Sequence, residues 1–338
     1  MTEQVWTPLH ARLHRTFRSR QLLPKGQRAI VAVSGGQDSL CLLRLMLDLQ
    51  PKWSWHLAVA HCDHRWRSDS ALNAAYVEEL AQTWEVPYYQ ATAPDLSPTE
   101  AAAREWRYQA LTEIALTQNY ACVVTGHTQS DRAETLLYNL LRGSGTDGLQ
   151  ALTWTRELVP GIRLIRPLLE FSRSETAEFC LTADLKIWED STNQDWRYAR
   201  NRIRQELIPY LQTHFNPQVE QALAQAGEVL RADLAYLEAV TDQWWQQVVR
   251  QESKEELTHE ADSPCWQVNR SQLKQAPLAI QRRLLRRVLL QVLPTAPNFE
   301  QIEKLVHLLA APNRSQTDPF PGGAIAQVTG DWIVLKQK

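Results

Sequence analysis

The stretch that decides the fold is RAIVAVSGGQDSL, residues 28–40. Its first part, Arg28 to Ser34, is a short apolar run rich in β-branched residues, which is typical of a buried strand. Gly35 and Gly36 end that run, and from Leu40 to Leu49 apolar residues return at helical spacing. The stretch therefore predicts a strand, a tight loop and a helix in succession.

The same alternation continues to about residue 141. Strands are expected near 57–61, 88–91 and 122–125, and helices over 72–84, 104–118 and 133–141. Strands that alternate with helices form parallel sheets covered by helices. We therefore predict an α/β fold, a Rossmann-like parallel sheet with helices on both faces.

The chain has 338 residues, more than one domain usually needs, and 44% of them are hydrophobic. The alternation breaks near 209–217. Beyond it, 219–249 and 278–293 have helical patterns, and 325–335 predicts a short β element. We predict two domains, residues 1–213 and a smaller, mainly helical domain over residues 214–338.

Composition excludes several classes of protein. The five cysteines are well separated and form no CxxC pair, so disulfides and metal clusters are not expected. No stretch approaches the roughly 18 consecutive apolar residues of a membrane span, so we predict a soluble, cytoplasmic protein with no membrane partner. Because the net charge is −2, any nucleic acid has to be held by local basic patches.

The loop SGGQDS, residues 34–39, has the features of a phosphate site. Two glycines allow a tight turn whose N–H groups approach an anion, and the helix that follows adds a favourable dipole. The carboxylate of Asp38 is suited to a Mg²⁺ ion that bridges phosphates. The predicted nucleotide-binding residues are Ser34, Gly35, Gly36, Gln37, Asp38 and Ser39. The alternative is a simple strand-to-helix turn in which Asp38 and Ser39 cap the helix.

Two other phosphate motifs are excluded. A Walker-type loop needs a glycine followed by lysine, and the sequence contains none. Gly143, Gly145 and Gly148 have the spacing of a dinucleotide fingerprint, but they follow a predicted helix instead of a strand. They are interpreted as the stop signal of that helix.

The order of the polar motifs resembles the PP-loop ATP pyrophosphatase family, whose fold is of the adenine nucleotide alpha hydrolase type. The loop is followed by HCDH at 61–64 and by Gly126-His127 with Asp131 and Glu134. Finer motifs resemble the tRNA(Ile)-lysidine synthases within that family: AAREWRY at 102–108, RGSG at 142–145, RPLL at 166–169, WEDSTN at 188–193 and RNRIR at 200–204.

This resemblance implies a ligase that uses ATP, Mg²⁺ and L-lysine and acts on tRNA(Ile) with a CAU anticodon. The amine of lysine would be joined to C2 of the wobble cytidine through an adenylated intermediate, with release of AMP and pyrophosphate. The cytidine C2 oxygen is a poor leaving group, so it has to be activated first. Lysine's amine, with a free pKa near 10.4, must also lose a proton before it attacks.

Asp38, Arg104, Asp131 and Glu134 are the predicted catalytic residues. Asp131 and Glu134 lie three apart at the start of a helix, so they share one face and could hold or deprotonate lysine, or simply cap the helix. Arg104 is expected to neutralise phosphate charge, and His61 to lie beside the nucleotide. Where many relatives have two adjacent aspartates the chain has Ser130-Asp131, so only Asp131 is available for their shared role.

Arginines supply the predicted tRNA contacts. Their contribution is expected to weaken with salt, and a solvated charged face is the alternative. The predicted tRNA-binding residues are Arg107, Arg197, Arg200, Arg202, Arg204, Arg282 and Arg286.

Three other functions are compatible with the loop. A tRNA thiolase would normally need paired cysteines, and an NAD or GMP synthetase needs no basic helical appendage. A nucleotide-regulated RNA-binding protein would bind ATP without turnover. The sequence is compatible with a homodimer.

Overall fold

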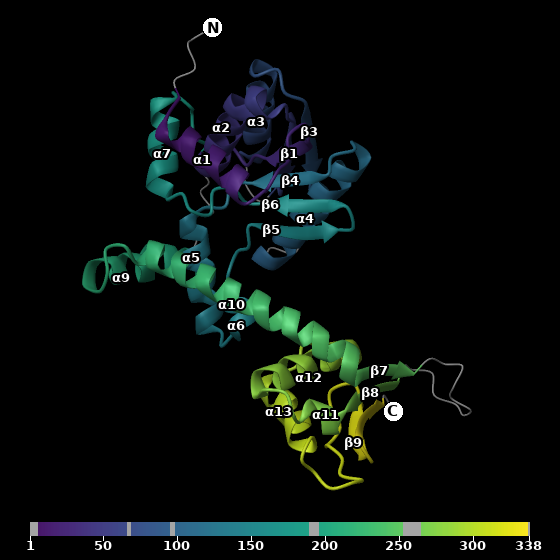
Figure 1. Ribbon diagram of the computed structural model, residues 1–338. Coiled ribbons are helices and arrows are strands. Elements are labelled where there is room, and N and C mark those ends of the chain that lie inside the picture. The colour runs from purple at the N-terminus through teal and green to yellow at the C-terminus, as the bar shows by residue number, and fades with distance from the viewer. Residues whose placement is uncertain (1–5, 66–68, 95–98, 189–195, 253–264, 337–338) are drawn as a thin grey trace. The chain divides into compact units, whose positions relative to one another are not determined.

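The computed structural model describes residues 6–65, 69–94, 99–188, 196–252 and 265–336. The chain forms two compact units, Met1–Leu230 and Arg231–Lys338, which divide within helix α10 (Val219–Val248) and are described here one at a time (Figure 1). The predicted boundary between residues 213 and 214 stays a prediction.

The first unit is built on a six-stranded sheet, whose order is β3-β2-β1-β4-β6-β5. The first five of these strands run parallel, and β5 alone is antiparallel to its neighbour. The strands are β1 (Arg28–Ala32), β2 (His56–Asp63), β3 (Tyr88–Thr92), β4 (Cys122–Thr125), β5 (Thr155–Val159) and β6 (Ile162–Ile165). The predicted parallel sheet is confirmed.

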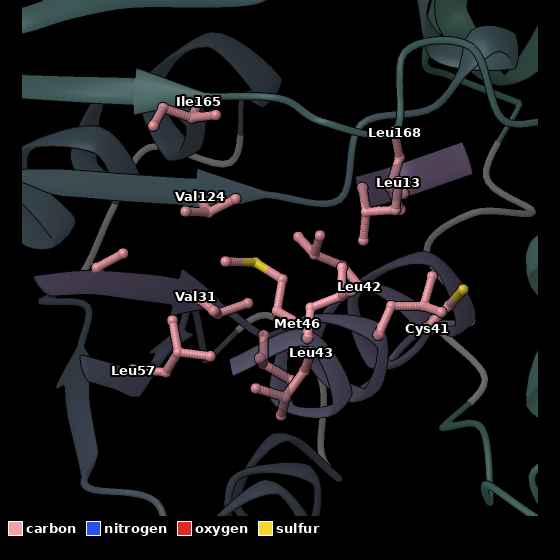
Figure 2. Close-up of a cluster of buried hydrophobic side chains, with 14 of the residues drawn as sticks. Leu13, Val31, Cys41, Leu42, Leu43, Met46, Leu57, Val124, Ile165 and Leu168 are labelled. Carbon is pink, nitrogen blue, oxygen red and sulfur yellow. The ribbon is translucent and has the colours of Figure 1, made fainter. Parts of the chain in front are cut away.

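Helices cover both faces of this sheet, as predicted. Alternate strand residues point to opposite faces, so Val31 packs with one helical layer and Ile30 with the other. Figure 2 shows the first layer, where Val31 and Val124 face Met46 of α2. That layer comprises α1 (Pro8–Ser19), α2 (Gln37–Trp53), α3 (Ser70–Thr83) and α7 (Arg173–Thr182), and the opposite face is covered by α4 (Glu100–Thr117).

The remaining helices of this unit follow β4 and β6. They are α5 (Gln129–Leu141), α6 (Thr146–Leu149), α8 (Ala199–Arg202), the π-helical turn η2 (Ile203–Leu207), α9 (Ile208–His214) and the first turns of α10. Helix α5 begins four residues earlier than predicted, because Thr128 and Asp131 form a capping box at its start. Gly143, with φ +70°, follows the end of α5 and stops that helix as predicted, whereas Gly145 caps the start of α6 and Gly148 lies within it.

The second unit packs helices against a four-stranded antiparallel sheet with the order β7-β8-β10-β9. Its two longer helices after the sheet begins are α12 (Leu278–Val292) and α13 (Phe299–Leu308), and α11 (Arg270–Leu273) is a single short turn. The strands of the sheet are β7 (Val249–Glu252), β8 (Cys265–Asn269), β9 (Ile325–Thr329) and β10 (Trp332–Lys336). The prediction found the β9–β10 hairpin but missed the other two strands. No helix within the described ranges has the length and apolarity needed to cross a membrane.

Candidate functional site

The glycine loop follows β1 and reaches α2 in a conformation that requires glycine. Gly35 has φ +85°, and a Cβ at this residue would lie 2.4 Å from Oδ1 of Asn73. Asn73 donates a hydrogen bond to the carbonyl oxygen of Ser34 (3.0 Å), and the backbone N–H of Trp188 donates to that of Gly35 (3.0 Å). The loop is therefore fixed by α3 on one side and by Trp188 on the other.

The two serines of the loop differ in exposure. Ser34 is exposed, whereas Ser39 is buried and donates its hydroxyl hydrogen to the carbonyl oxygen of Gly36 (2.8 Å). The Ser39 oxygen also accepts a hydrogen bond from the Ser34 N–H (3.2 Å). Ser39 thus holds the loop closed, while Ser34 is open to a ligand at the N-terminus of α2.

His61 lies beneath the loop. It is 3% exposed, and its Nδ1 lies 2.8 Å from the carbonyl oxygen of Val33. Since a carbonyl only accepts, Nδ1 carries the hydrogen. His61 supports the last residue before the loop, and its predicted contact with nucleotide stays a prediction.

Asp38 begins α2 and points toward α7. Its Oδ1 accepts a hydrogen bond from the Thr176 hydroxyl (2.5 Å), and its Oδ2 lies 3.4 Å from Nε of Arg173. Burial raises the pKa of Asp38, although the neighbouring Arg173 opposes the rise. Gln37 also links α2 to α7, because its Nε2 donates to the Arg173 carbonyl oxygen (2.8 Å) and to the Thr176 hydroxyl oxygen (3.1 Å).

Asp131 is held at the start of α5 by its own cap. Its Oδ2 accepts hydrogen bonds from the N–H (2.8 Å) and the hydroxyl (3.0 Å) of Thr128. Its Oδ1 lies 3.4 Å from Nη2 of Arg173 and 3.6 Å from Nη2 of Arg204. Burial favours the neutral acid, but Arg173, His127 and the Thr128 N–H outweigh it, and the pKa of Asp131 is lowered. The capping interpretation of Asp131 is correct, yet one oxygen still faces two guanidinium groups.

Glu134 is buried one turn later on α5. Arg204 of η2 binds it through two hydrogen bonds, Nε to Oε1 (2.6 Å) and Nη2 to Oε2 (2.8 Å). Burial nevertheless raises the pKa of Glu134, and the charge of Asp131 adds to the rise. The two predicted acids therefore share one face of α5, and their pKa values are shifted in opposite directions.

The three predicted carboxylates converge at one edge of the sheet. Asp38 follows β1, Asp131 and Glu134 follow β4, and these neighbouring strands run parallel. Ligands of such sheets bind at the carboxyl ends of the strands. Arg173 joins Asp38 to Asp131, and sequence reasoning missed it together with Thr176, because both lie on α7, far away along the chain.

The predicted arginine Arg104 lies in a second, cationic part of this edge. Arg104 and Arg107 of α4 have their guanidinium carbons 5.4 and 5.6 Å from the ring centre of Tyr108. His127, two residues after β4, has charge interactions with both parts, with Asp131 and with Arg104 and Arg107. Burial is the main reason that the pKa of His127 is lowered, so its ring is neutral.

The predicted tRNA arginines fall into three situations. Arg197 and Arg202 are exposed, whereas Arg200 donates to the Thr135 hydroxyl (3.3 Å) and Arg204 binds the acids of α5. In the second unit, Arg282 of α12 forms two hydrogen bonds with Glu303 of α13 (2.7 and 3.0 Å). Arg283 and Arg287 beside it pair with Glu238, and Arg286 also has a partner. A tRNA contact by Arg282 would need its ion pair to open. In the WEDSTN motif, 189–193 lie outside the described residues.

Comparison with known proteins decides the family. A family model described as a PP-loop domain matches residues 7–211, and one described as a TilS substrate binding domain matches residues 269–329. A tRNA(Ile)-lysidine synthase of Nostoc sp. is 60% identical, over 98% of this chain and 98% of its own length. A tRNA(Ile)-lysidine synthase of Synechocystis sp. is 53% identical, over 97% and 98%.

The chain belongs to the tRNA(Ile)-lysidine synthase family. It is accordingly an enzyme of the ligase class, with the ATP-binding PP-loop domain and the tRNA-modifying role of that family. Among solved structures, a U34-tRNA thiolase of Methanococcus maripaludis is similar, with a TM-score of 0.56 and 13% identity over 66% of this chain and 78% of its own. At that identity the similarity shows the fold alone.

Proposed function

We propose that the protein ligates L-lysine to C2 of the wobble cytidine in the CAU anticodon of tRNA(Ile), with ATP cleaved to AMP and pyrophosphate. The observation that carries the proposal is the convergence of Asp38, Asp131 and Glu134 beside the glycine loop. Two substrates have to meet there, an ATP with its negative phosphates and a lysine with its positive amine. The site offers groups of both signs.

The loop fits the pyrophosphate of ATP. The positive φ of Gly35 and the N-terminus of α2 at Gly36 turn backbone N–H groups toward the open side of the loop, where Ser34 is exposed. Asp38, in the first turn of α2, is the residue that would hold Mg²⁺, which screens phosphate charge when bound. Arg104 is proposed to stabilise the charge that develops on the α-phosphate while the cytidine C2 oxygen is adenylated.

The two acids of α5 suit two different tasks toward lysine. The lowered pKa of Asp131 keeps it ionised at neutral pH, so it is suited to bind the ammonium group. The raised pKa of Glu134 makes it the better proton acceptor, since general bases work best with a pKa near the ambient pH. We propose that Asp131 binds the lysine amine, that Glu134 takes its proton, and that the neutral amine then displaces AMP from C2.

The tRNA is proposed to be held by arginines of both units. Arg107, Arg197, Arg200, Arg202 and Arg204 belong to the first unit, and Arg282 and Arg286 to the second. The match of residues 269–329 to a substrate binding domain supports a tRNA-binding role for the proposed domain 214–338.

The test is incorporation of labelled lysine into isoleucine tRNA transcripts with CAU or GAU anticodons, with and without ATP. Label is expected in the CAU transcript alone, with one AMP and one pyrophosphate released per lysine. Label in neither transcript, or in both equally, contradicts the proposal.

Variants separate the two acids. Asp131→Asn is expected to raise the KM for lysine, because it removes the charge that binds the ammonium. Glu134→Gln is expected to lower kcat about 10²-fold or more, as for loss of a general base. Glu113→Gln, at an exposed residue of α4, is the matched control and should retain full activity. Equal effects of both variants on KM alone would contradict the division of roles.

A further inference from the structure

Four arginines surround the side chain of Tyr108, and only two of them were predicted to be functional. Arg104 and Arg107 come from α4, and Arg156 of β5 lies with its guanidinium carbon 4.8 Å from the Tyr108 ring centre. Arg166, directly after β6, interacts with the Tyr108 hydroxyl group. Helix α4 and the β5–β6 pair of strands thus bring their positive charges to one place, named here the Tyr108 cluster.

The charges of the Tyr108 cluster are not balanced by acids. Within the described residues, none of these four arginines forms a salt bridge with a carboxylate. The pKa of Arg104 is lowered, first by burial and then by the neighbouring guanidinium groups. Arg166 is buried, and a buried charge is normally paired, while an arrangement of like charges is costly. Binding of an anionic ligand is the simplest reason for such a cluster to exist.

The cluster also has hydrogen-bonding capacity to spare at its centre. Arg166 is 2% exposed, and its Nη1 donates to the carbonyl oxygen of Thr153 (2.8 Å), but its Nε is buried without a partner in the described part of the chain. Tyr108 is 9% exposed, and its hydroxyl oxygen is buried without a hydrogen-bond partner of good geometry in the same part of the chain. Orphaned buried donors indicate a ligand with acceptor oxygens.

We propose that the Tyr108 cluster is a phosphate-binding site, in which Arg156, Arg166 and Tyr108 act together with Arg107, while Arg104 keeps the role toward ATP proposed above. Arginine and phosphate form charge-assisted hydrogen bonds in a fixed geometry, and a tyrosine hydroxyl adds a further donor. The phosphate belongs to the backbone of the RNA substrate next to the nucleotide that reacts. This assignment of its source depends on the proposed function.

The place of the cluster in the sheet favours RNA over ATP. The glycine loop follows β1, whereas the cluster is formed by α4, β5 and the residue after β6, and α4 packs on β4, β5 and β6. The pyrophosphate of ATP already has a site at the loop. A nucleotide whose base reaches the α-phosphate places its own backbone phosphate further along the same edge, which is where the cluster lies. Arg156 is exposed, so the cluster is open to a large ligand.

The test uses Arg156→Gln and Tyr108→Phe in the full chain. The matched control is Arg28→Gln, because Arg28 also lies over a tyrosine, Tyr120 (4.5 Å), but at the opposite, amino end of β1. Arg156→Gln is expected to raise the Kd for the CAU tRNA about tenfold and to reduce its salt dependence by about one counterion, the effect of losing one charged phosphate contact. Tyr108→Phe should weaken the tRNA about three- to tenfold. The Kd for ATP should be unchanged in both.

Other outcomes have distinct meanings. If tRNA affinity is the same in Arg156→Gln as in the Arg28 control while the wild type still incorporates lysine, the phosphate site is wrong and the proposed function stands. If ATP affinity falls and tRNA affinity does not, the site takes a phosphate of ATP, and the RNA assignment is wrong.

Inorganic phosphate tests the site without RNA. It should stabilise the wild type and the Arg28 control against thermal unfolding more than it stabilises Arg156→Gln. Equal stabilisation of all three would overturn the phosphate site itself, even if the proposed function had also failed.

Discussion

An ion pair with a buried arginine fixes helix α5, which carries Asp131 and Glu134. Arg132 is 1% exposed and lies on α5 between the two acids of the site. Its Nη2 donates to Oε2 of Glu228 (2.6 Å) in the part of α10 that belongs to the first unit. The Glu228 carboxylate also accepts from Nε1 of Trp154 (3.1 Å) and from Nη1 of Arg20 (3.0 Å). One carboxylate therefore joins three donors from separate segments.

We expect Glu228→Gln to destabilise the first unit by about 2–3 kcal/mol. Breaking a fully buried pair costs about 3–5 kcal/mol, because one charge is left unpaired in a medium of low polarity. The Glu228 side chain is 29% exposed, so water replaces part of the lost interaction, and the lower figure follows. Glutamine keeps an acceptor for Trp154, which confines the effect to the charge.

The double variant Arg132→Met with Glu228→Gln separates charge from packing. It removes the unpaired charge, and an apolar replacement of similar volume is often neutral, so at least half of the lost stability should return. The measurement is urea unfolding followed by circular dichroism, with Glu113→Gln as the exposed control. A loss below about 0.5 kcal/mol for Glu228→Gln, or a double variant less stable than the single one, would refute the reasoning.

Two further predictions concern the site itself. Gly126→Ala should weaken ATP binding in calorimetric titration, because the added Cβ would lie 2.8 Å from the Asp38 carbonyl oxygen, whereas Gly145→Ala meets no atom within 4 Å and should bind normally. Without nucleotide or divalent cations, Asp38→Asn should raise the midpoint of thermal unfolding at neutral pH, and Asp131→Asn should lower it. The raised pKa of Asp38 means that its stabilising contribution is lost as pH rises, whereas the lowered pKa of Asp131 gives a contribution that is lost as pH falls. If both variants shift the unfolding midpoint in the same direction, the opposite pKa shifts of Asp38 and Asp131 are contradicted.

Local patterns predicted the frame of the first unit. The run at 28–34 and the spacing of 40–49 specify a strand and a helix from neighbouring residues alone, and both are present as β1 and α2. Asp38, Asp131 and Glu134 could be expected to meet because parallel strands deliver their carboxyl ends to one edge. That argument uses only topology, which the alternation of elements already indicates.

Contacts between distant segments could not be predicted in the same way. Arg173 reaches Asp38 across 135 positions of sequence because α7 packs beside α2, and no spacing rule connects them. Arg204 was predicted to contact tRNA, and it also binds Glu134. A run of arginines in a sequence indicates positive charge but does not identify which acid each arginine contacts. The strands β7 and β8 were missed because β7 continues directly from α10, and β8 is paired with the distant strand β10.

The proposed reaction requires an ammonium group and phosphates to bind close together without cancelling the charges of the site itself. Two groups of side chains with opposite charge, each with its own partners, suit this requirement. Asp38, Asp131 and Glu134 contact Arg173 and Arg204, and the arginines of the Tyr108 cluster gather around a tyrosine. His127, whose Nδ1 lies 2.8 Å from the Thr125 hydroxyl, has charge interactions with Asp131 and with Arg104 and Arg107, and its ring is neutral. A charged residue in its place would bind to one of these groups and weaken it, so a neutral imidazole suits a position that interacts with both.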